Sequence, residues 1–223
     1  MKAMILSAGF GTRLKHYTTK IPKALVKYRN KPMISYQIEL LKKLGVDEIV
    51  VNAHHHSHKI IEYFTENKFG VDGYVIVEEE ILGTGGGILN AEQFFRNEDF
   101  FLVINVDVET NMDFERMIIY HQSKNPLATI AVQNRISKRY LEFDNDMKLT
   151  GRAKKIDPTV NQFAFNGVHI ISGRIFKLGL ELKYQDILEI YFKAIKEKNE
   201  VVLGYDVGGC KFKDLGKIEN LLS

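Results

Sequence analysis

Two basic residues follow the glycines of a segment near the start of the chain. Gly9-Phe10-Gly11-Thr12-Arg13 follows an apolar run, and Pro22-Lys23 comes a short span later. Backbone amides in a glycine turn can point at one anion, and small residues allow a phosphate to approach closely. An arginine and a lysine at this separation can hold two phosphate-bearing molecules together. The segment therefore predicts a phosphate-binding loop that carries its own cations.

Two better-known phosphate loops fit this segment poorly. The dinucleotide-binding fingerprint G-x-G-x-x-G matches Gly9 and Gly11, but its third glycine falls on Leu14. The P-loop of ATPases needs G-K-[ST] after its glycines, and neither glycine run of this chain supplies that sequence. Taken singly, Arg13 and Lys23 also fit ordinary solvated charges, so the prediction rests on their combination with the glycines and the preceding strand.

Two aspartates, distant in sequence, each come after a predicted strand. Asp107 follows the apolar run 100–104, and Asp214 comes after the run 201–205. Because parallel strands end at one edge of a sheet, we expect the two carboxylates to converge on one Mg²⁺, which prefers carboxylate and phosphate oxygens. The alternatives are a turn residue at Asp107 and a helix cap at Asp214, before Lys217.

A second glycine run, Gly83-Thr84-Gly85-Gly86-Gly87, lies between a predicted strand and a predicted helix. Glycines in this position allow a base or ribose to approach the backbone closely, and the alternative is a flexible turn. The run His54-His55-His56-Ser57-His58 is interpreted as a solvated loop, because neighbours in sequence do not share one face of a helix or strand. Cys210 is the single cysteine, which excludes an intrachain disulfide.

Hydrophobic patterning predicts strands that alternate with helices over most of the chain. This alternation favours an α/β fold, a Rossmann-like three-layer sandwich around a mixed, mostly parallel central sheet. The strands are expected at Lys2–Leu6, Glu48–Asn52, Tyr74–Val77, Phe100–Ile104, Ala128–Val132 and Val201–Tyr205. The main helices are expected to begin near Pro32, Ser57, Ile88, Asp113 and Leu188, with a short closing helix from Lys217.

Between about residues 135 and 175 the pattern changes. Strands are expected at Tyr140–Phe143, Lys148–Thr150 and Gly167–Ile171, separated by turns and with little helix between them. We interpret this stretch as a small antiparallel insertion beside the main sheet. The chain has no internal repeat and no flexible linker, so we expect one domain over residues 1–223.

The overall composition narrows the class of protein. The chain has 223 residues, 45% of them hydrophobic, which suffices for one well-cored domain. Its formal net charge is only +3, whereas nucleic-acid binders typically carry a large excess of basic residues. We see no signal peptide and no apolar run long enough to span a membrane. The expectation is a cytoplasmic protein, monomeric or homodimeric, with no nucleic-acid or membrane partner.

The order of these segments resembles that of sugar-1-phosphate nucleotidylyltransferases. The family signature is a strand followed by G-x-G-T-R-L and then by P-K. The resembling segments cover nearly the whole chain: Gly9–Leu14, Pro22–Leu25, Leu82–Ile88, Asn105–Asp107, Phe165–Val168 and Asp214–Gly216.

The resemblance implies a GT-A-like fold whose antiparallel insertion binds the sugar. It also implies transfer of a nucleoside monophosphate from an NTP (UTP, GTP or dTTP) to a sugar 1-phosphate, with release of pyrophosphate. Arg13 and Lys23 are then catalytic, and Asp107 and Asp214 bind Mg²⁺. The implied nucleotide-binding residues are Leu6, Ala8, Gly9, Gly11, Thr12, Gly85 and Gly86, and the implied sugar-binding residues are Asn105, Asn166 and Gly167.

Within the family, the chain resembles N-acetylmuramate-1-phosphate uridylyltransferases and heptose- or mannose-1-phosphate guanylyltransferases. The triple glycine favours UTP with an N-acetylated amino-sugar phosphate. Val106 departs from the usual glycine, and the family's Glu-Lys-Pro lysine has no clean match among Arg152, Lys154 and Lys155. The alternatives are a cytidylyltransferase acting on another phosphorylated small molecule, and an inactive regulatory protein that binds a nucleotide or a nucleotide sugar.

Overall fold

A mixed nine-stranded sheet forms the centre of the computed structural model, which describes residues 1–222. Strand β1 (Lys2–Leu6) lies in the middle and pairs in parallel with β4 (Glu48–Ala53) and β6 (Phe100–Asn105). The rest of the sheet comprises β5 (Asp72–Val77), β8 (Ala128–Gln133), β9 (Leu141–Phe143), β10 (Leu149–Arg152), β11 (Asn161–Ser172) and β12 (Val202–Asp206). The predicted α/β class with a mixed, mostly parallel sheet is confirmed.

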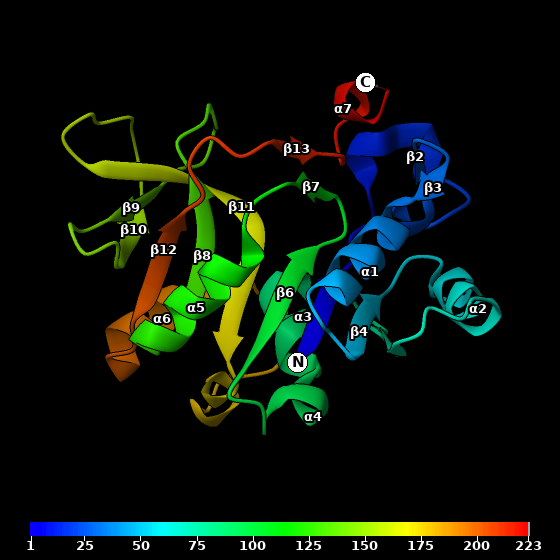
Figure 1. The fold of residues 1–223 in the computed structure, drawn as a ribbon, viewed down its shortest axis with the longest axis horizontal. Helices are drawn as coiled ribbons and strands as arrows, with labels where there is room; N and C mark the ends of the chain where they lie inside the picture. The colour runs from blue at the N-terminus through cyan, green and yellow to red at the C-terminus, as the bar shows by residue number, and fades with distance from the viewer. Residues whose placement is uncertain (223) are drawn as a thin grey trace.

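Helices cover both faces of the sheet, as the apolar strands require. In β1, Ala3 and Ile5 face one hydrophobic core, whereas Met4 and Leu6 face the other. A strand that is buried on both faces carries few polar residues, which explains the short continuous apolar runs in the sequence. The first core is covered by α1 (Met33–Lys43), α2 (Ser57–Glu66) and α5 (Phe114–Lys124), and the second by α3 (Gly83–Asn90), α4 (Glu92–Phe95) and α6 (Ile187–Lys198). Figure 1 shows α1 and α5 in front of the sheet and α3 behind it.

Local sequence sets the ends of two of these helices. Asp186 and Glu189 form a capping box at the start of α6, and Asn199 ends the helix in the left-handed conformation. Asp113 accepts a hydrogen bond from the backbone N–H of Arg116 at the start of α5. Both helices therefore begin close to where the sequence predicts them.

The fold differs from expectation in three places. Helix α3 begins at Gly83, so the second glycine run forms its first turns instead of a loop before it. Strand β11 is twelve residues long, because it pairs with β9 through its first part and with β6 and β8 through the rest. The short ribbons β2–β3 (Lys27–Tyr28 and Lys31–Pro32) and β7–β13 (Val108–Thr110 and Phe212–Asp214) were not predicted.

The carboxyl ends of β1 and β6 lie at one edge of the sheet. Three short 3₁₀ segments complete the chain, η1 (Thr12–Thr18), η2 (Lys23–Leu25) and η3 (Gly173–Lys177). Ribbon β7–β13 and the closing helix α7 (Ile218–Leu221) lie along the edge where β6 ends, near β2 (Figure 1). Open α/β sheets bind their ligands at this edge. Within residues 1–222, no helix has the length and apolar character needed to cross a membrane.

Two buried histidines give the fold a predictable response to acid. Burial lowers the pKa of His169 to about 3, and burial together with the charge of Arg174 lowers the pKa of His121 to about 4. Both side chains are neutral in the folded protein at pH 7, whereas an unfolded histidine titrates near pH ~6.5. Between about pH 6.5 and pH 4 the unfolded state therefore binds more protons, and its relative stability rises as the pH falls.

We expect the free energy of unfolding to fall by about 1.4 kcal/mol per pH unit for each of these histidines over that range. Urea unfolding at a series of pH values measures this slope. His121→Gln should flatten the slope, and replacement of the exposed His58 by Gln should leave it unchanged. Equal slopes in the wild type and in His121→Gln would contradict the assignment.

Candidate active site

A cavity of about 210 Å³ opens at the carboxyl ends of β1 and β6. One wall is formed by the end of β1 and the loop that follows it (residues 7–13, called the first loop), through Leu6, Ser7, Ala8 and Gly9. Asn105 and Asp107 form another wall. Arg13 and Lys23 line the same cavity. The structure thus brings together the first loop, both predicted cations and one predicted aspartate. Thr12 and Gly11 belong to the same segment but do not line the cavity.

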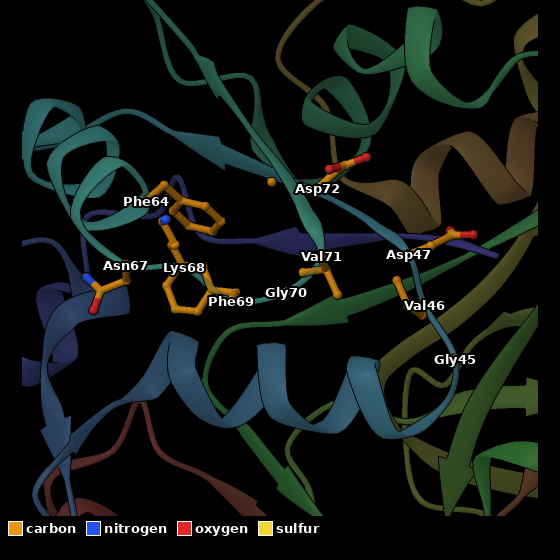
Figure 2. Close-up of a pocket in the computed structure, with 11 residues that line it drawn as sticks. Gly45, Val46, Asp47, Phe64, Asn67, Lys68, Phe69, Gly70, Val71 and Asp72 are labelled. Carbon is orange, nitrogen blue, oxygen red and sulfur yellow. The ribbon is translucent and has the colours of Figure 1, made fainter.

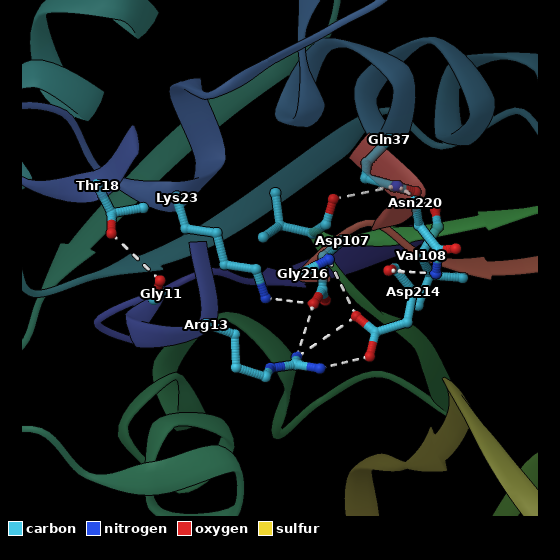
Figure 3. Close-up of polar contacts among 11 residues, drawn as sticks. Gly11, Arg13, Thr18, Lys23, Gln37, Asp107, Val108, Asp214, Gly216 and Asn220 are labelled. Atoms are coloured by element: carbon cyan, nitrogen blue, oxygen red, sulfur yellow. Dashed lines mark hydrogen bonds and ion pairs between the residues drawn. The ribbon is translucent and has the colours of Figure 1, made fainter. Parts of the chain in front are cut away.

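Two cations and two carboxylates meet at the edge of this cavity (Figure 3). Arg13 donates through Nη1 to Asp214 Oδ2 at 2.6 Å, and its Nη2 lies 3.5 Å from Asp107 Oδ2 and 3.4 Å from Asp214 Oδ1. Lys23 donates to the same oxygen of Asp107. The guanidinium of Arg13 therefore lies between the two carboxylates, which confirms that they converge at one place.

The exposure of this cluster is uneven. The side chain of Arg13 is 55% exposed, whereas those of Lys23 and Asp107 are 14% and 10% exposed. Burial alone would raise the pKa of the Asp214 carboxyl, but the hydrogen bond and charge of Arg13 outweigh it, and the pKa lies below its ordinary value. Asp214 is therefore ionised at neutral pH. An exposed ion pair adds little stability, so Arg13 can leave its carboxylate for a stronger anion at low cost.

A short ribbon places Asp214 beside Asp107. In the β7–β13 ribbon Asp214 is the partner of Val108, the residue that follows Asp107. The backbone N–H of Leu215 also donates to the carbonyl of Asp107 at 2.8 Å. The convergence was predicted correctly, but its predicted cause was wrong. Asp214 lies on a separate antiparallel ribbon and not at the end of a parallel strand of the main sheet.

Gly216 marks the point that the cluster surrounds. A Cβ atom at Gly216 would lie 2.5 Å from Asp107 Oδ2, 2.6 Å from Arg13 Nη2 and 2.9 Å from Asp214 Oδ1. The two carboxylates therefore surround a common point at which only a hydrogen fits. Two carboxylates beside a phosphate-sized cavity are a donor set that suits Mg²⁺, which takes few protein ligands and completes its shell with water and phosphate oxygens. Residues 1–222 hold no group of three or more His, Cys, Asp or Glu suited to a metal, so any Mg²⁺ here would depend on phosphate oxygens.

Gly11 positions Lys23. Its φ of +66° is left-handed, and an added Cβ would lie 2.8 Å from Thr18 Cγ2 and 3.1 Å from Lys23 Cβ. The absence of a side chain therefore lets the first loop pack directly against the Lys23 segment. Thr18 Oγ1 donates to the carbonyl of Gly11 at 3.1 Å and closes this turn. The structure therefore gives Gly11 a packing role that places Lys23, and it does not bring Gly11 to the cavity.

Only the first residues of the second glycine run contribute to the wall of the cavity. Gly83 and Thr84, the first residues of α3, line the cavity. Gly85 instead faces α6, where an added Cβ would lie 2.7 Å from Ile190 Cδ1, and Gly86 faces the segment before α6, where it would lie 2.3 Å from the Lys183 carbonyl oxygen. The structure does not bring these two glycines to the cavity. Their lack of side chains serves the packing of α3 against α6.

Asn52 and Glu78 form a connection that the sequence analysis missed. Asn52 accepts a hydrogen bond from the backbone N–H of Ser7 at 2.8 Å and donates to Glu78 Oε1 at 2.7 Å. Glu78 Oε2 accepts from the backbone N–H of Leu82 at 3.0 Å. Asn52 and Glu78 are both about 3% exposed. This buried chain of hydrogen bonds holds the first loop and the start of α3 at a fixed separation.

Of the three predicted sugar-binding residues, Asn105 lines the cavity, and Asn166 and Gly167 do not. An added Cβ at Gly167 would lie 2.6 Å from Asn105 Nδ2. Asn166 is buried beside Gly167. Of the basic residues near the missing Glu-Lys-Pro segment, Arg152 lies 3.6 Å from Asp186, and Lys154 and Lys155 are exposed.

The histidine run is only partly a loop: His54, His55 and His56 form a partly exposed turn, whereas Ser57 and His58 are the first residues of α2. His54 Nδ1 lies 2.8 Å from the carbonyl oxygen of Glu78, and His56 Nε2 lies 3.1 Å from that of Thr19. The run belongs to no cluster of potential metal ligands within residues 1–222. The ring of Phe10, from the first loop, packs edge-on against His54.

A second, larger hollow of about 570 Å³ lies at the opposite edge of the sheet (Figure 2). It is lined by residues around the beginnings of β4 and β5, among them Asp47, Phe64, Lys68 and Asp72. The Asp47 carboxylate already pairs with the N-terminal amine at 3.2 Å. The hollow holds no converging set of cations for a phosphate, and it is at the edge where open α/β sheets do not usually bind ligands. We therefore assign the site to the smaller cavity.

Comparison with known proteins identifies the family of the chain. Residues 2–223 match the family model described as nucleotidyl transferase. The chain belongs to the nucleotidyl transferase family. The Arg13 loop, Lys23 and the converging aspartates thus lie in a fold that this family uses to transfer nucleotidyl groups.

Two relatives named mannose-1-phosphate guanyltransferase illustrate the similarity. That of Neurospora crassa is 38% identical over 135 residues, which cover 59% of this chain and 37% of the relative. That of Debaryomyces hansenii is 30% identical over 232 residues, which cover all of this chain and 63% of the relative. The chain therefore spans less than two thirds of the length of these relatives. HddC from Yersinia pseudotuberculosis, solved with GMP-PN, shares the fold at a TM-score of 0.79 and 24% identity, covering 99% of this chain and 96% of that one.

Gly216→Ala tests whether the two carboxylates must approach one point. The added methyl group would push them apart, and a displacement of about 1 Å at a reacting centre costs on the order of a hundredfold in turnover. We expect a loss of that size in pyrophosphate release, with the secondary structure retained by circular dichroism. Gly209→Ala is the matched control, because nothing lies within 4 Å of an added Cβ there. Full activity in Gly216→Ala would mean that the carboxylates act independently.

Proposed function

We propose that the protein is a sugar-1-phosphate nucleotidylyltransferase, which transfers a nucleoside monophosphate from an NTP to a sugar 1-phosphate and releases pyrophosphate. The observation that carries the proposal is the meeting of Arg13, Lys23, Asp107 and Asp214 at the cavity beside the first loop. Family membership supports the reaction type. The names of the relatives support a sugar 1-phosphate as acceptor.

The reaction joins two anions, so positioning and charge neutralisation carry the catalysis. An oxygen of the sugar phosphate attacks the α-phosphorus of the triphosphate, and pyrophosphate leaves. The attacking phosphate is already ionised near pH 7, so no general base is needed. This fits a cavity that contains cations and carboxylates but no catalytic Ser-His-Asp or Cys-His set among its lining residues.

Each cation has a separate task in this proposal. Arg13, exposed and forked, binds the leaving β- and γ-phosphates through paired hydrogen bonds. Lys23, more deeply placed, meets the α-phosphate and the incoming phosphate. Asp107 and Asp214 would hold Mg²⁺, a hard cation that would neutralise phosphate charge when bound. In the free protein the carboxylates instead hold Arg13 and Lys23 in place before the substrate arrives.

For the base we propose guanine and for the sugar mannose or a related hexose. The support is the name mannose-1-phosphate guanyltransferase shared by the relatives. The expectation of UTP with an N-acetylated amino sugar rested on the triple glycine. Because Gly85 and Gly86 pack against α6 and the segment before it, they favour neither base. A regulatory protein without activity is disfavoured, because all four charged residues are present and close together.

A matrix of UTP, GTP, CTP, dTTP and ATP against several sugar 1-phosphates, read by pyrophosphate release with Mg²⁺ present, tests the function. We expect the highest turnover with GTP and mannose 1-phosphate. No pyrophosphate release with any pair would contradict the proposal, and turnover only with CTP and an alcohol phosphate would favour a cytidylyltransferase.

With the best pair, Arg13→Ala and Lys23→Ala should each lower turnover by about a hundredfold or more, the typical cost of losing one transition-state donor. Steady-state kinetics measures the loss, and circular dichroism checks that the variants fold. The exposed Lys20 lies between the two and is the matched control, because Lys20→Ala should keep full activity. Near-wild-type turnover in either test variant would remove that residue from the mechanism.

A further inference from the structure

Arg135 is a half-buried cation without an acidic partner. Within residues 1–222, the arginines that are neither fully exposed nor fully buried are Arg135 and Arg174. Arg174 pairs with Glu200 at 3.2 Å, whereas Arg135 forms no salt bridge in the described part of the chain. Removing a guanidinium from water without an anion is costly, so such a charge is favoured where an anion is to be bound.

Three contacts fix the Arg135 guanidinium. Its Nε donates to Asn166 Oδ1 at 2.9 Å, and its Nη2 donates to the carbonyl of Phe165 at 2.8 Å. The guanidinium carbon lies 4.2 Å from the centre of the Phe212 ring. These contacts use two of the five N–H donors of the side chain. The remaining donors are held in a rigid plane and form no hydrogen bond within residues 1–222.

The same contacts direct Arg135 toward the active site. Phe212 lies two residues before Asp214 on β13, so the two side chains share one face of the ribbon. Asn166 and Gly167 lie on β11 at a break in its pairing with β8, between Phe165 and His169. Such irregularities re-aim side chains near functional sites. Gly167 in turn contacts Asn105, which lines the cavity.

Electrostatics gives the same location. Burial lowers the pKa of Arg135, and the negative charge of Asp214 partly opposes this effect. The Arg135 side chain is therefore close enough to Asp214 to interact with its charge, but the two residues form no salt bridge. An anion that binds beside Asn105 and Asp214 would therefore contact the guanidinium of Arg135, which is already held in place and only partly exposed to water.

We infer that Arg135 binds the phosphate of the acceptor substrate, on the opposite side of the charged cluster from the loop that holds the triphosphate. This role rests on the proposed function, and it identifies a residue that binds the sugar phosphate within the same site. Paired N–H donors in one plane match two phosphate oxygens, a geometry that lysine cannot supply. Asn166, whose amide oxygen accepts from Arg135, is then a positioning residue.

The test compares KM values for the two substrates in the full-length protein, with GTP and mannose 1-phosphate as the probes, or with the best pair from the matrix if it differs. Arg135→Met should raise KM for the sugar phosphate about tenfold or more, the size expected for a charge-assisted hydrogen bond. KM for the triphosphate should change less than about twofold. Arg135→Lys should recover part of the sugar-phosphate affinity, because it keeps the charge but loses the fork. Arg139→Met, at an exposed arginine on the same segment, should behave as wild type.

The outcomes separate this inference from the proposed function. Wild-type turnover with an unchanged sugar-phosphate KM in Arg135→Met would overturn the inference and leave the function intact. Equal increases in both KM values, together with a lower melting temperature, would also overturn it, since they would show a purely structural role. If Arg135→Met fails to fold, the KM values of Arg135→Lys and Arg135→Gln for the two substrates are compared instead, with the same interpretation. No turnover by the wild type with any substrate pair would overturn both proposals.

Discussion

Two carboxylates face each other across the Gly216 position, and two cations keep them there. Like charges this close repel, and the repulsion grows where side chains leave water. Arg13 bridges Asp107 and Asp214, and Lys23 neutralises Asp107 from the other side. In the proposed function, this arrangement holds in place the charged groups that the two phosphate substrates would contact, and the ion pairs would break when those substrates bind. Most of the neighbouring structure can be understood as the means of holding these four side chains together.

Each member of the cluster comes from a different part of the fold. Asp107 follows the buried strand β6, and Arg13 and Lys23 come from the two 3₁₀ segments that follow β1. Asp214 arrives from the far end of the sequence on the β7–β13 ribbon. Asn52 and Glu78 fix the cavity wall opposite the cluster, by linking Ser7 to Leu82 through buried hydrogen bonds. Hydrogen bonds and ion pairs thus join segments that are distant in sequence, at the edge of the sheet where β1 and β6 end.

The sequence was most informative where the determinants are local. Apolar runs buried on both faces predicted β1, β4 and β6, and the glycines and cations near the start of the chain predicted segments that meet at one cavity. The β7–β13 ribbon was missed because its strands have three residues each and pair across the length of the chain. The sequence predicts that Gly85 and Gly86 face a ligand, because glycines that permit helix packing look the same in sequence as glycines that admit a ligand; the structure shows packing instead. Asn52, Glu78 and Arg135 gave no local signal, since their importance depends on partners brought near only by folding.

We propose that Asp214 pairs with Arg13 in the free protein and would hold the metal when nucleotide is bound. Calorimetric titration of GTP into wild type and Asp214→Asn, once with Mg²⁺ and once with a chelator, tests it directly. Without metal, the variant should bind GTP more tightly than wild type, because Arg13 is released to the phosphates. With Mg²⁺, the variant should bind more weakly, because a metal ligand is lost. A variant that binds GTP more weakly under both conditions, or equally in both, would contradict the account.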